Sequence, residues 1–353
     1  MNPRKADACQ HHETERMTMI RLGILDQSQI GEGKTASEAL KETTALAVEA
    51  EKMGYTRFWM SEHHGSRSLA HSSPEIMIAH VAAATRTIRV GSGGVMLPHY
   101  SAYKVAENFR LLEALHPGRI DLGLGRAPGG GPLSTRALHE GKTYHYDQYP
   151  RQVLDLIDYF QETTEEHRFA GLFASPSVGT HPEIWLLGSS DESARIAAQL
   201  GTAYGFAQFF GTPGGPEAVR RYKEHFRPGR LAAEPRALAA VLAICAETEE
   251  EANDLALSAD LYFLGIERGF ELTWLPSVET ARNYPYTEFD LELILRARSR
   301  RIVGTPGKVR EGLERLAEEY AADELLIVSP IHDFAKRLNS FRLIAEAFGL
   351  ADR

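Results

Sequence analysis

Short apolar runs alternate with longer amphipathic segments along almost the entire chain of 353 residues. Strand-like runs such as 20–25 and 88–97 are followed by segments with apolar residues at helical spacing, such as 35–52 and 102–115. This alternation predicts parallel strands joined by helical crossovers. About eight such units favour a (β/α)8 TIM barrel with insertions, in the α/β class, over an open sheet. No G-x-G-x-x-G motif follows the first strand, which argues against a Rossmann fold.

The chain is expected to form one domain, 19–353, preceded by a polar tail, 1–18. The tail lacks the apolar segment of a secretory signal and is predicted to be disordered. A net charge of −9 argues against nucleic acids and anionic membranes as main partners. No apolar run has membrane-spanning length, and Cys9 and Cys245 do not make a disulfide framework. We therefore expect a cytoplasmic protein.

The most informative strand end is the run 57–64, where apolar and aromatic residues give way to Glu62, His63 and His64. In a barrel, the reaction site lies at the C-terminal ends of the strands. Adjacent side chains on an extended chain point to opposite sides, so one of the two imidazoles is expected to face inward. An imidazole there suits proton transfer near neutral pH. The alternatives are a buried structural histidine and a metal site with His71 or His99, although no H-x-H or H-E-x-x-H spacing is present.

Further strand ends carry residues that suit a phosphorylated ligand. Glycines interrupt the run 88–97, as expected for a bulge, a packing kink or the close approach of a flat ligand. Arg126 follows the next strand, and the strand after that leads into a helix start with three hydroxyls, Ser189, Ser190 and Ser193. A guanidinium and a helix N-terminus both bind phosphate, although a salt bridge and ordinary capping explain either one alone. Together they predict a phosphorylated cofactor or substrate near a histidine–glutamate pair.

Several segments, in the same order along the chain, resemble the bacterial luciferase-like family of flavin-dependent monooxygenases. They are 58–64, 89–98, 112–126, 185–190 and 304–306. The resemblance is close over 20–210 and looser over 300–350. It is strongest to the single-chain subgroup whose third strand reads Gly-Ser-Gly-Gly-Val-Met-Leu-Pro. This resemblance implies a (β/α)8 barrel that holds FMN at its C-terminal face.

The resemblance also implies roles for individual residues. His63 matches a histidine that is needed for activity beside the flavin ring, and Glu62 is its neighbour, so both are candidate catalytic residues. Arg126 matches a phosphate-binding arginine, and Arg151 is similar to a second one. Gly125 stands where bacterial luciferase has a reactive cysteine, which argues against light emission. The other implied cofactor-binding positions are Ser92, Gly93 and Gly94, where the family has a non-proline cis peptide at the paired glycines, and Leu187, Gly188, Ser189, Ser190 and Ser193.

The implied reaction is oxygen activation. Reduced FMN from a separate flavin reductase reacts with O₂ to a C4a-peroxyflavin, which oxidises a small organic substrate. The loops 127–149 and 264–287 are expected to shape the substrate pocket, with the candidates Tyr144, His145, Tyr146, Phe263 and Trp274. The family further implies a homodimer, and no metal is expected. The alternatives are a deazaflavin (F420)-dependent hydride-transfer enzyme and a non-catalytic flavin-binding protein, similar to the inactive partner chain of luciferase.

Overall fold

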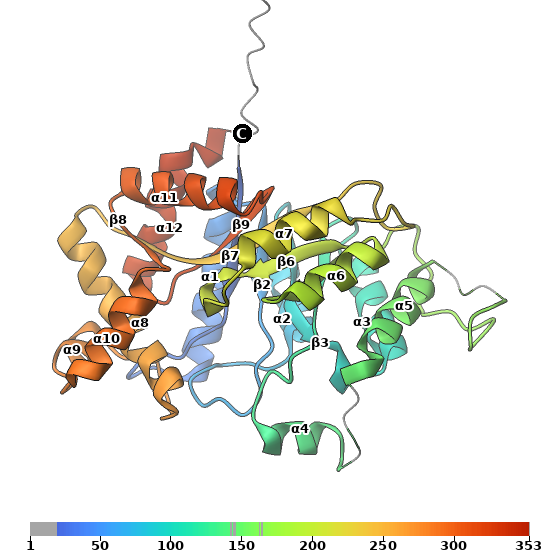
Figure 1. Ribbon diagram of the computed structural model, residues 1–353, viewed down its shortest axis with the longest axis horizontal. Helices are drawn as coiled ribbons and strands as arrows, with labels where there is room; N and C mark the ends of the chain where they lie inside the picture. Colours follow the sequence, from blue (N-terminus) through green and yellow to red (C-terminus); the bar gives the residue numbers. More distant parts are fainter. Residues whose placement is uncertain (1–19, 142, 144–145, 162, 164, 353) are drawn as a thin grey trace, which may run out of the picture.

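Eight parallel strands close into a barrel in the computed structural model (Figure 1), which describes residues 20–352 except 142, 144–145, 162 and 164. Each strand pairs with the next along the chain from β1 to β7, and β9 pairs with both β7 and β1 to close the ring. This confirms the predicted (β/α)8 barrel. The barrel strands are β1 (Arg21–Asp26), β2 (Arg57–Met60), β3 (Arg89–Met96), β4 (Ile120–Gly125), β5 (Glu183–Gly188), β6 (Ala203–Ala207), β7 (Ala237–Cys245) and β9 (Glu324–Val328).

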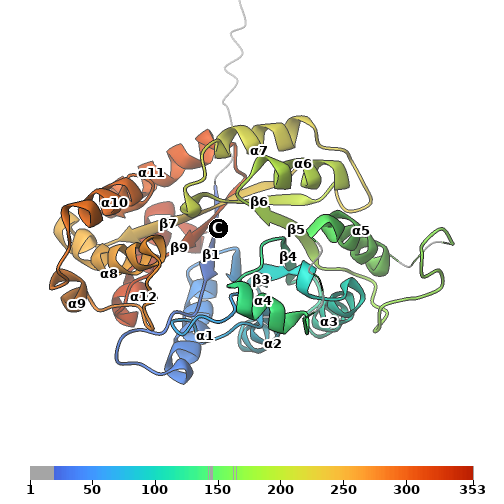
Figure 2. The same ribbon diagram turned by 60° about the horizontal axis from the view of Figure 1, so that its bottom comes forward.

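Helices surround this barrel, as Figure 2 shows when the molecule is tilted. Local sequence sets several of their ends: Thr35 and Glu38 form a capping box at the start of α1, and Gly201 ends α6 in the left-handed conformation. No helix in the described part of the chain is long and apolar enough to cross a membrane. The helices around the barrel are α1 (Ala36–Lys52), α2 (Pro74–Ala84), α3 (Ala102–Leu115), α5 (Tyr149–Phe160), α6 (Asp191–Leu200), α7 (Gly215–Glu224), α8 (Glu249–Arg268), α11 (Pro306–Glu319) and α12 (Phe334–Phe348).

The insertions differ in detail from the sequence-based expectation. The loop 127–149 contains α4 (Pro132–Leu138), which extends below the barrel in Figure 1. The expected irregular excursion from 264 begins late, because α8 continues to Arg268 before α9 (Val278–Arg282) and α10 (Glu288–Arg298). A short strand that the sequence did not predict, β8 (Ile302–Gly304), pairs with the C-terminal end of β7 outside the barrel. Three residues are too few to show an alternating pattern.

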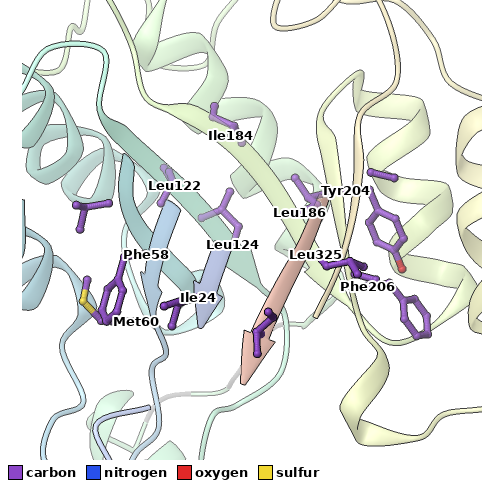
Figure 3. Close-up of a cluster of buried hydrophobic side chains, with 14 of the residues drawn as sticks. Ile24, Phe58, Met60, Leu122, Leu124, Ile184, Leu186, Tyr204, Phe206 and Leu325 are labelled. Carbon is purple, nitrogen blue, oxygen red and sulfur yellow. The ribbon is translucent and has the colours of Figure 1, made fainter. Parts of the chain in front are cut away.

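Two apolar layers hold the barrel together. Residues that alternate along each strand point to opposite faces, so Ile24 and Phe58 pack outward against the helices (Figure 3), while Leu25 and Trp59 fill the barrel interior. The interior cluster also contains Trp185, whose ring meets that of Trp59 edge-on at a centroid distance of 5.7 Å. Several members of this interior cluster, including Leu25 and Trp59, also line the cavity at the C-terminal rim.

A buried ion network lies beneath these two tryptophans, near the N-terminal ends of the strands. The guanidinium of Arg57 lies 2.6 Å from Oδ2 of Asp121 and 2.8 Å from Oε1 of Glu324, and all three side chains are almost fully buried. Nε1 of Trp59 donates to the same Oδ2 of Asp121 at 2.8 Å. The network pairs the buried guanidinium with two carboxylates and fixes the orientation of Trp59.

Three-residue 3₁₀ turns join several of these elements. Two of them, η1 (Leu97–His99) and η3 (Gln208–Phe210), follow barrel strands directly at the C-terminal rim. The others are η2 (Tyr146–Gln148), which precedes α5, and η4 (Leu350–Asp352), which follows α12.

Candidate active site

A cavity of about 540 Å³ opens at the C-terminal ends of the barrel strands. Its size lies in the range typical of small-molecule and cofactor sites. Residues from β2, β4 and the start of α6 meet there, among them His63, Arg126 and Ser190. Of the residues singled out from the sequence, those that line the cavity are Glu62, His63, Gly93, Gly94, Gly125, Arg126, Tyr146, Leu187, Gly188, Ser189, Ser190 and Ser193.

The two adjacent histidines after β2 point to different places, as the extended chain predicts. His63 lines the cavity, whereas the ring of His64 turns away and its Nε2 lies 2.7 Å from Oε1 of Glu62. The backbone N–H of His64 donates to the carbonyl of Gly129 at 2.7 Å. The long loop after β4 therefore fastens the end of β2 and helps to set the position of His63.

His63 is a largely buried imidazole in a mixed environment. Burial lowers its pKa, and this effect outweighs the nearby charge of Glu62, which acts to raise it. The ring is therefore neutral near pH 7, and a neutral imidazole can accept a proton at one nitrogen while it donates at the other. Its nearest side-chain partner is Gln27, whose Nε2 lies 3.5 Å from Nε2 of His63.

Glu62 is fully buried, and both of its carboxylate oxygens are engaged. Oε1 accepts hydrogen bonds from Nε2 of His64 at 2.7 Å and from the hydroxyl of Tyr100 at 2.8 Å. Oε2 accepts from the backbone N–H of Met96 at 3.0 Å. Burial and the charge of Glu62 raise the pKa of Tyr100 well above its usual value, so the phenol keeps its proton. This arrangement suits a carboxylate that joins the ends of β2 and β3 better than one that exchanges protons with a ligand.

Another part of the cavity lining combines a guanidinium with a helix N-terminus. Arg126 follows β4, and its NH1 lies 2.6 Å from Oε2 of Glu192 in the first turn of α6. Ser190 caps α6, since its Oγ accepts from the backbone N–H of Ser193. Ser193 in turn donates through its hydroxyl to the carbonyl of Ser190 at 2.7 Å. The serines therefore cap the helix and line the cavity at once, and the neighbouring ends of β4 and β5 bring them beside Arg126.

The glycine pair in β3 forms part of the cavity wall. The peptide bond between Gly93 and Gly94 is cis, as the family resemblance implied. A Cβ at Gly94 would lie 2.6 Å from the carbonyl oxygen of Gly123, so the barrel wall leaves no room for a larger residue. Ser92 does not line the cavity; it is fully buried and its hydroxyl donates to the same carbonyl at 2.9 Å.

Several residues expected at the site lie elsewhere. Arg151 is on α5, where its Nε lies 3.1 Å from Oδ1 of Asp155, and it lines a separate pocket of about 290 Å³. Phe263 is outside the cavity because α8 is longer than expected, and its ring packs under the guanidinium of Arg301 at 5.0 Å. Trp274 is 43% exposed and also lies outside it. Tyr144 and His145 lie outside the described residues.

Other cavity residues were not singled out as site residues from the sequence. Phe209 and Phe210 come from η3, and their rings pack together at a centroid distance of 4.5 Å to form an aromatic wall. Gln27 follows β1 and faces His63. Each of these residues lies on or directly follows a barrel strand, and that position was the available signal. The aromatic residues were missed because their apolar side chains are equally typical of the core.

The alternative of a metal site finds no cluster to support it among the described residues: no group of three or more His, Cys, Asp or Glu side chains there is arranged to hold a metal ion. Nε2 of His99 lies 2.7 Å from the carbonyl oxygen of Pro128, and its Nδ1 lies 2.9 Å from Nε2 of His139. These contacts join η1 to the loop that carries α4.

The structure defines the chain as a closed (β/α)8 barrel whose rim cavity is lined by a largely buried imidazole and by a guanidinium beside a helix N-terminus. Residues 19–324 match the family model described as luciferase-like monooxygenase. The chain belongs to the luciferase-like monooxygenase family.

Individual relatives agree with this assignment over nearly the full length. The chain is 51% identical to the protein YwcH of Bacillus subtilis (strain 168), covering 94% of this chain and 99% of that one. It is 41% identical to an N-acetyl-S-alkylcysteine monooxygenase of the same organism, covering 95% and 100%. Among solved structures, apo-MsnO8 is 37% identical and superimposes with a TM-score of 0.84, covering 94% of this chain and 99% of that one.

Proposed function

We propose that this protein is an FMN-dependent monooxygenase that uses reduced FMN from a separate flavin reductase, together with O₂, to oxidise a small organic substrate. The observation that carries the proposal is the shared cavity, which is lined by Arg126, by the start of α6 and by His63. A cavity lined in this way suits a ligand that joins a phosphate to a flat ring. Family membership supports the reaction class.

The donor groups at the α6 end fit the phosphate of FMN. A guanidinium, serine hydroxyls and the free N–H groups of a helix N-terminus are all phosphate donors. The hydroxyls belong to Ser189, Ser190 and Ser193, and the guanidinium to Arg126. Because Arg126 is paired with Glu192, which is 54% exposed at its side chain, we expect that carboxylate to swing into solvent when an anion binds.

The middle of the cavity fits a flat ring. Gly93, Gly94 and Leu187 present a surface with little side-chain bulk, and the barrel interior beneath it is apolar. FMN bound here would supply the electrons and the oxygen activation. The chain itself would bind and orient the ring, exclude water through its apolar walls, and hold a hydrogen bond at His63.

The substrate would lie against the aromatic wall formed by Phe209 and Phe210, and Tyr146 also lines the cavity. These residues suit an uncharged, partly apolar group close to the ring. The relative that is 41% identical is named for N-acetyl-S-alkylcysteine, which contains a thioether. Thioethers of this kind are therefore the first compounds to test.

We further propose a homodimer in the cytoplasm. Three large apolar side chains are exposed on the neighbouring helices α2 and α3, namely Ile76 (68%), Leu111 (53%) and Leu115 (59%). Burial of such side chains against a second copy would stabilise a symmetric dimer.

Light scattering after gel filtration should give twice the chain mass for the wild type. Leu115→Glu should shift the measured mass toward that of the monomer. A wild-type monomer at micromolar concentration would refute this assembly.

The reaction is tested with the purified chain, a flavin reductase, NADH and ¹⁸O₂. We expect tight binding of reduced FMN under anaerobic conditions and transfer of one ¹⁸O atom to a thioether such as N-acetyl-S-methylcysteine or another member of a substrate panel. Tighter binding of reduced F420 than of reduced FMN, with substrate oxidised or reduced in the absence of O₂, would establish hydride transfer instead. Binding of reduced FMN with no product from any substrate would favour a non-catalytic flavin-binding protein.

A further inference from the structure

We propose that Gln27 is a positioning residue that holds His63 as the tautomer protonated at Nδ1, so that Nε2 is the accepting nitrogen of the ring. Its importance for the reaction rests on the proposed function, in which His63 hydrogen-bonds to the bound flavin or to the substrate. The structural claim itself concerns only this chain's side chains.

The side-chain amide of Gln27 has a defined orientation. Gln27 follows β1, which pairs with β2, and its side chain lies beside the end of that strand. Nε2 of Gln29 donates to Oε1 of Gln27 at 3.4 Å. Because Oε1 accepts from Gln29, the NH₂ group of Gln27 is the one turned toward His63, at 3.5 Å from its Nε2.

The orientation of the Gln27 amide determines the tautomer of the His63 imidazole. An amide NH₂ only donates, so Nε2 of His63 has to accept, and the ring proton then resides on Nδ1. The nearby backbone of Gly129 acts to raise the pKa of His63, which agrees with a ring N–H on the nitrogen that does not face Gln27.

Gln29 is itself held in place by burial and by its backbone contacts. Its side chain is 8% exposed, and its backbone forms an antiparallel bridge with Leu69. Flanking backbone hydrogen bonds of 2.8–2.9 Å tie Ile30 to Ser68 and Ala70 to Ser28. Backbone hydrogen bonds therefore hold segment 28–30 against loop 65–73, and this fixes the position of Gln29 beside Gln27. The two side-chain contacts are long, so each shifts the tautomer ratio by a modest amount.

The charged and titratable groups around His63 do not compete for its Nε2. Asp26 is bound by Arg337, and the carboxylate of Glu62 is occupied by three donors. His64 is turned to Glu62, and His71 is a second buried imidazole whose nitrogens have no hydrogen-bond partner in the structure. Burial lowers the pKa of both His63 and His71, so neither carries a full charge near neutral pH.

The consequence is a direction for the first proton transfer at this site. With Nε2 unprotonated, a cavity O–H or N–H group that displaces the long contact from Gln27 finds an acceptor there. His63 then takes a hydrogen bond or a proton first, and it can return that proton. The opposite tautomer would place an N–H at the cavity and make the ring a donor from the start. Gln27 thus determines whether Nε2 of His63 acts as an acceptor or a donor, although Gln27 itself does not contact the reacting atoms.

The proposal is tested by long-range ¹H–¹⁵N correlation spectra of the full chain labelled in its 14 histidines, recorded without flavin. The signal of His63 is assigned by its loss in His63→Gln. We expect the Nδ1–H pattern in the wild type and a larger fraction of Nε2–H in Gln27→Leu, with a smaller shift in Gln29→Leu. Gln199→Leu, which removes an exposed glutamine of α6, should leave the spectrum of His63 unchanged.

A charge-introducing variant gives an independent readout. Gln27→Glu places a carboxylate beside Nε2, so the pKa of His63 should rise by about one unit or more, and Nε2 should become protonated. An Nε2–H pattern in the wild type would overturn the proposal, as would a tautomer ratio and a pKa that do not respond to substitution of Gln27. If the tautomer depends on Gln27 but the protein does not bind reduced FMN, the positioning role stands and the proposed function fails.

Discussion

Nε2 of His64 lies 2.7 Å from Oε1 of Glu62, so the two residues that flank His63 are bound to each other. The pair lies behind the strand end, together with Tyr100, and leaves the imidazole between them to face the cavity. Within the run Glu62-His63-His64, one residue is thus placed to act on a ligand and two are placed to hold it there. The predictions below separate these roles.

Removal of the cavity imidazole should abolish turnover without loss of the cofactor. His63→Gln should lower product formation by about 100-fold or more, because general acid–base groups typically contribute that much, while the Kd for reduced FMN changes less than about threefold. Turnover coupled to a flavin reductase and an anaerobic fluorescence titration measure the two quantities. His80→Gln, at an exposed position on α2, is the control and should match the wild type. A large rise in Kd with a proportionate loss of turnover would make His63 a binding residue only.

Arg126 and Arg151 should differ in their effect on flavin binding. Arg126→Ala should raise the Kd for FMN by about tenfold or more, because a hydrogen bond to a charged group contributes roughly 1.5–3 kcal/mol. The Kd for riboflavin, which lacks the phosphate, should change less than about twofold. Arg151→Ala should leave both constants near the wild-type values, since Arg151 is held by Asp155 outside the cavity. An equal loss of FMN and riboflavin affinity in Arg126→Ala would argue against a phosphate contact.

Tyr100 should contribute to stability through Glu62. Tyr100→Phe removes one donor from a fully buried carboxylate, and we expect the free energy of unfolding to fall by about 1.5–3 kcal/mol. Tyr103→Phe is a matched control on the same segment, because its hydroxyl donates to the carbonyl of Phe173 in an exposed setting. Urea denaturation of both variants measures the difference. If Tyr100→Phe lost no more stability than Tyr103→Phe, Glu62 would have found a replacement donor.

Glu51 should make folding stability sensitive to acid. Partial burial acts to raise the pKa of Glu51, but the backbone N–H groups of Thr87, Ile88 and Arg86 donate to it and lower the pKa to about 2. A carboxylate of the unfolded chain titrates near about 4.3, so this stabilisation is complete above that pH and is lost as the pH falls toward 2.

Urea midpoints at several pH values test this assignment. Glu51→Gln should be less stable than the wild type at pH 6, and the difference should shrink as the pH falls through about 4 toward 2. Glu49→Gln, on the same helix and bonded only to the exposed Lys52, should show little change at any pH. A stability difference between Glu51→Gln and the wild type that stays constant with pH would show that the effect comes from packing alone.

Local sequence patterns determined much of this protein. The alternation of strand-like and helical segments specified the barrel, since each pattern is a local consequence of which face of an element is buried. The positions of His63, Arg126 and Ser190 shortly after the barrel strands β2, β4 and β5 placed them at one rim. The opposite directions of His63 and His64 followed from the geometry of an extended chain.

Only the tertiary structure decided how those parts meet. The carboxylate of Glu62 turns to Tyr100, a residue 38 positions away, because burial requires that its charge be satisfied by whatever donors the fold supplies. Arg151 pairs with Asp155 and stays outside the cavity, while Phe209 and Phe210 enter it; an arginine suits a salt bridge as well as a phosphate, and a phenylalanine suits a core as well as a wall. β8 forms because β7 offers its C-terminal end for pairing. Local sequence patterns determine the order of helices and strands, whereas the partners of each polar group depend on contacts between residues that are distant in the chain.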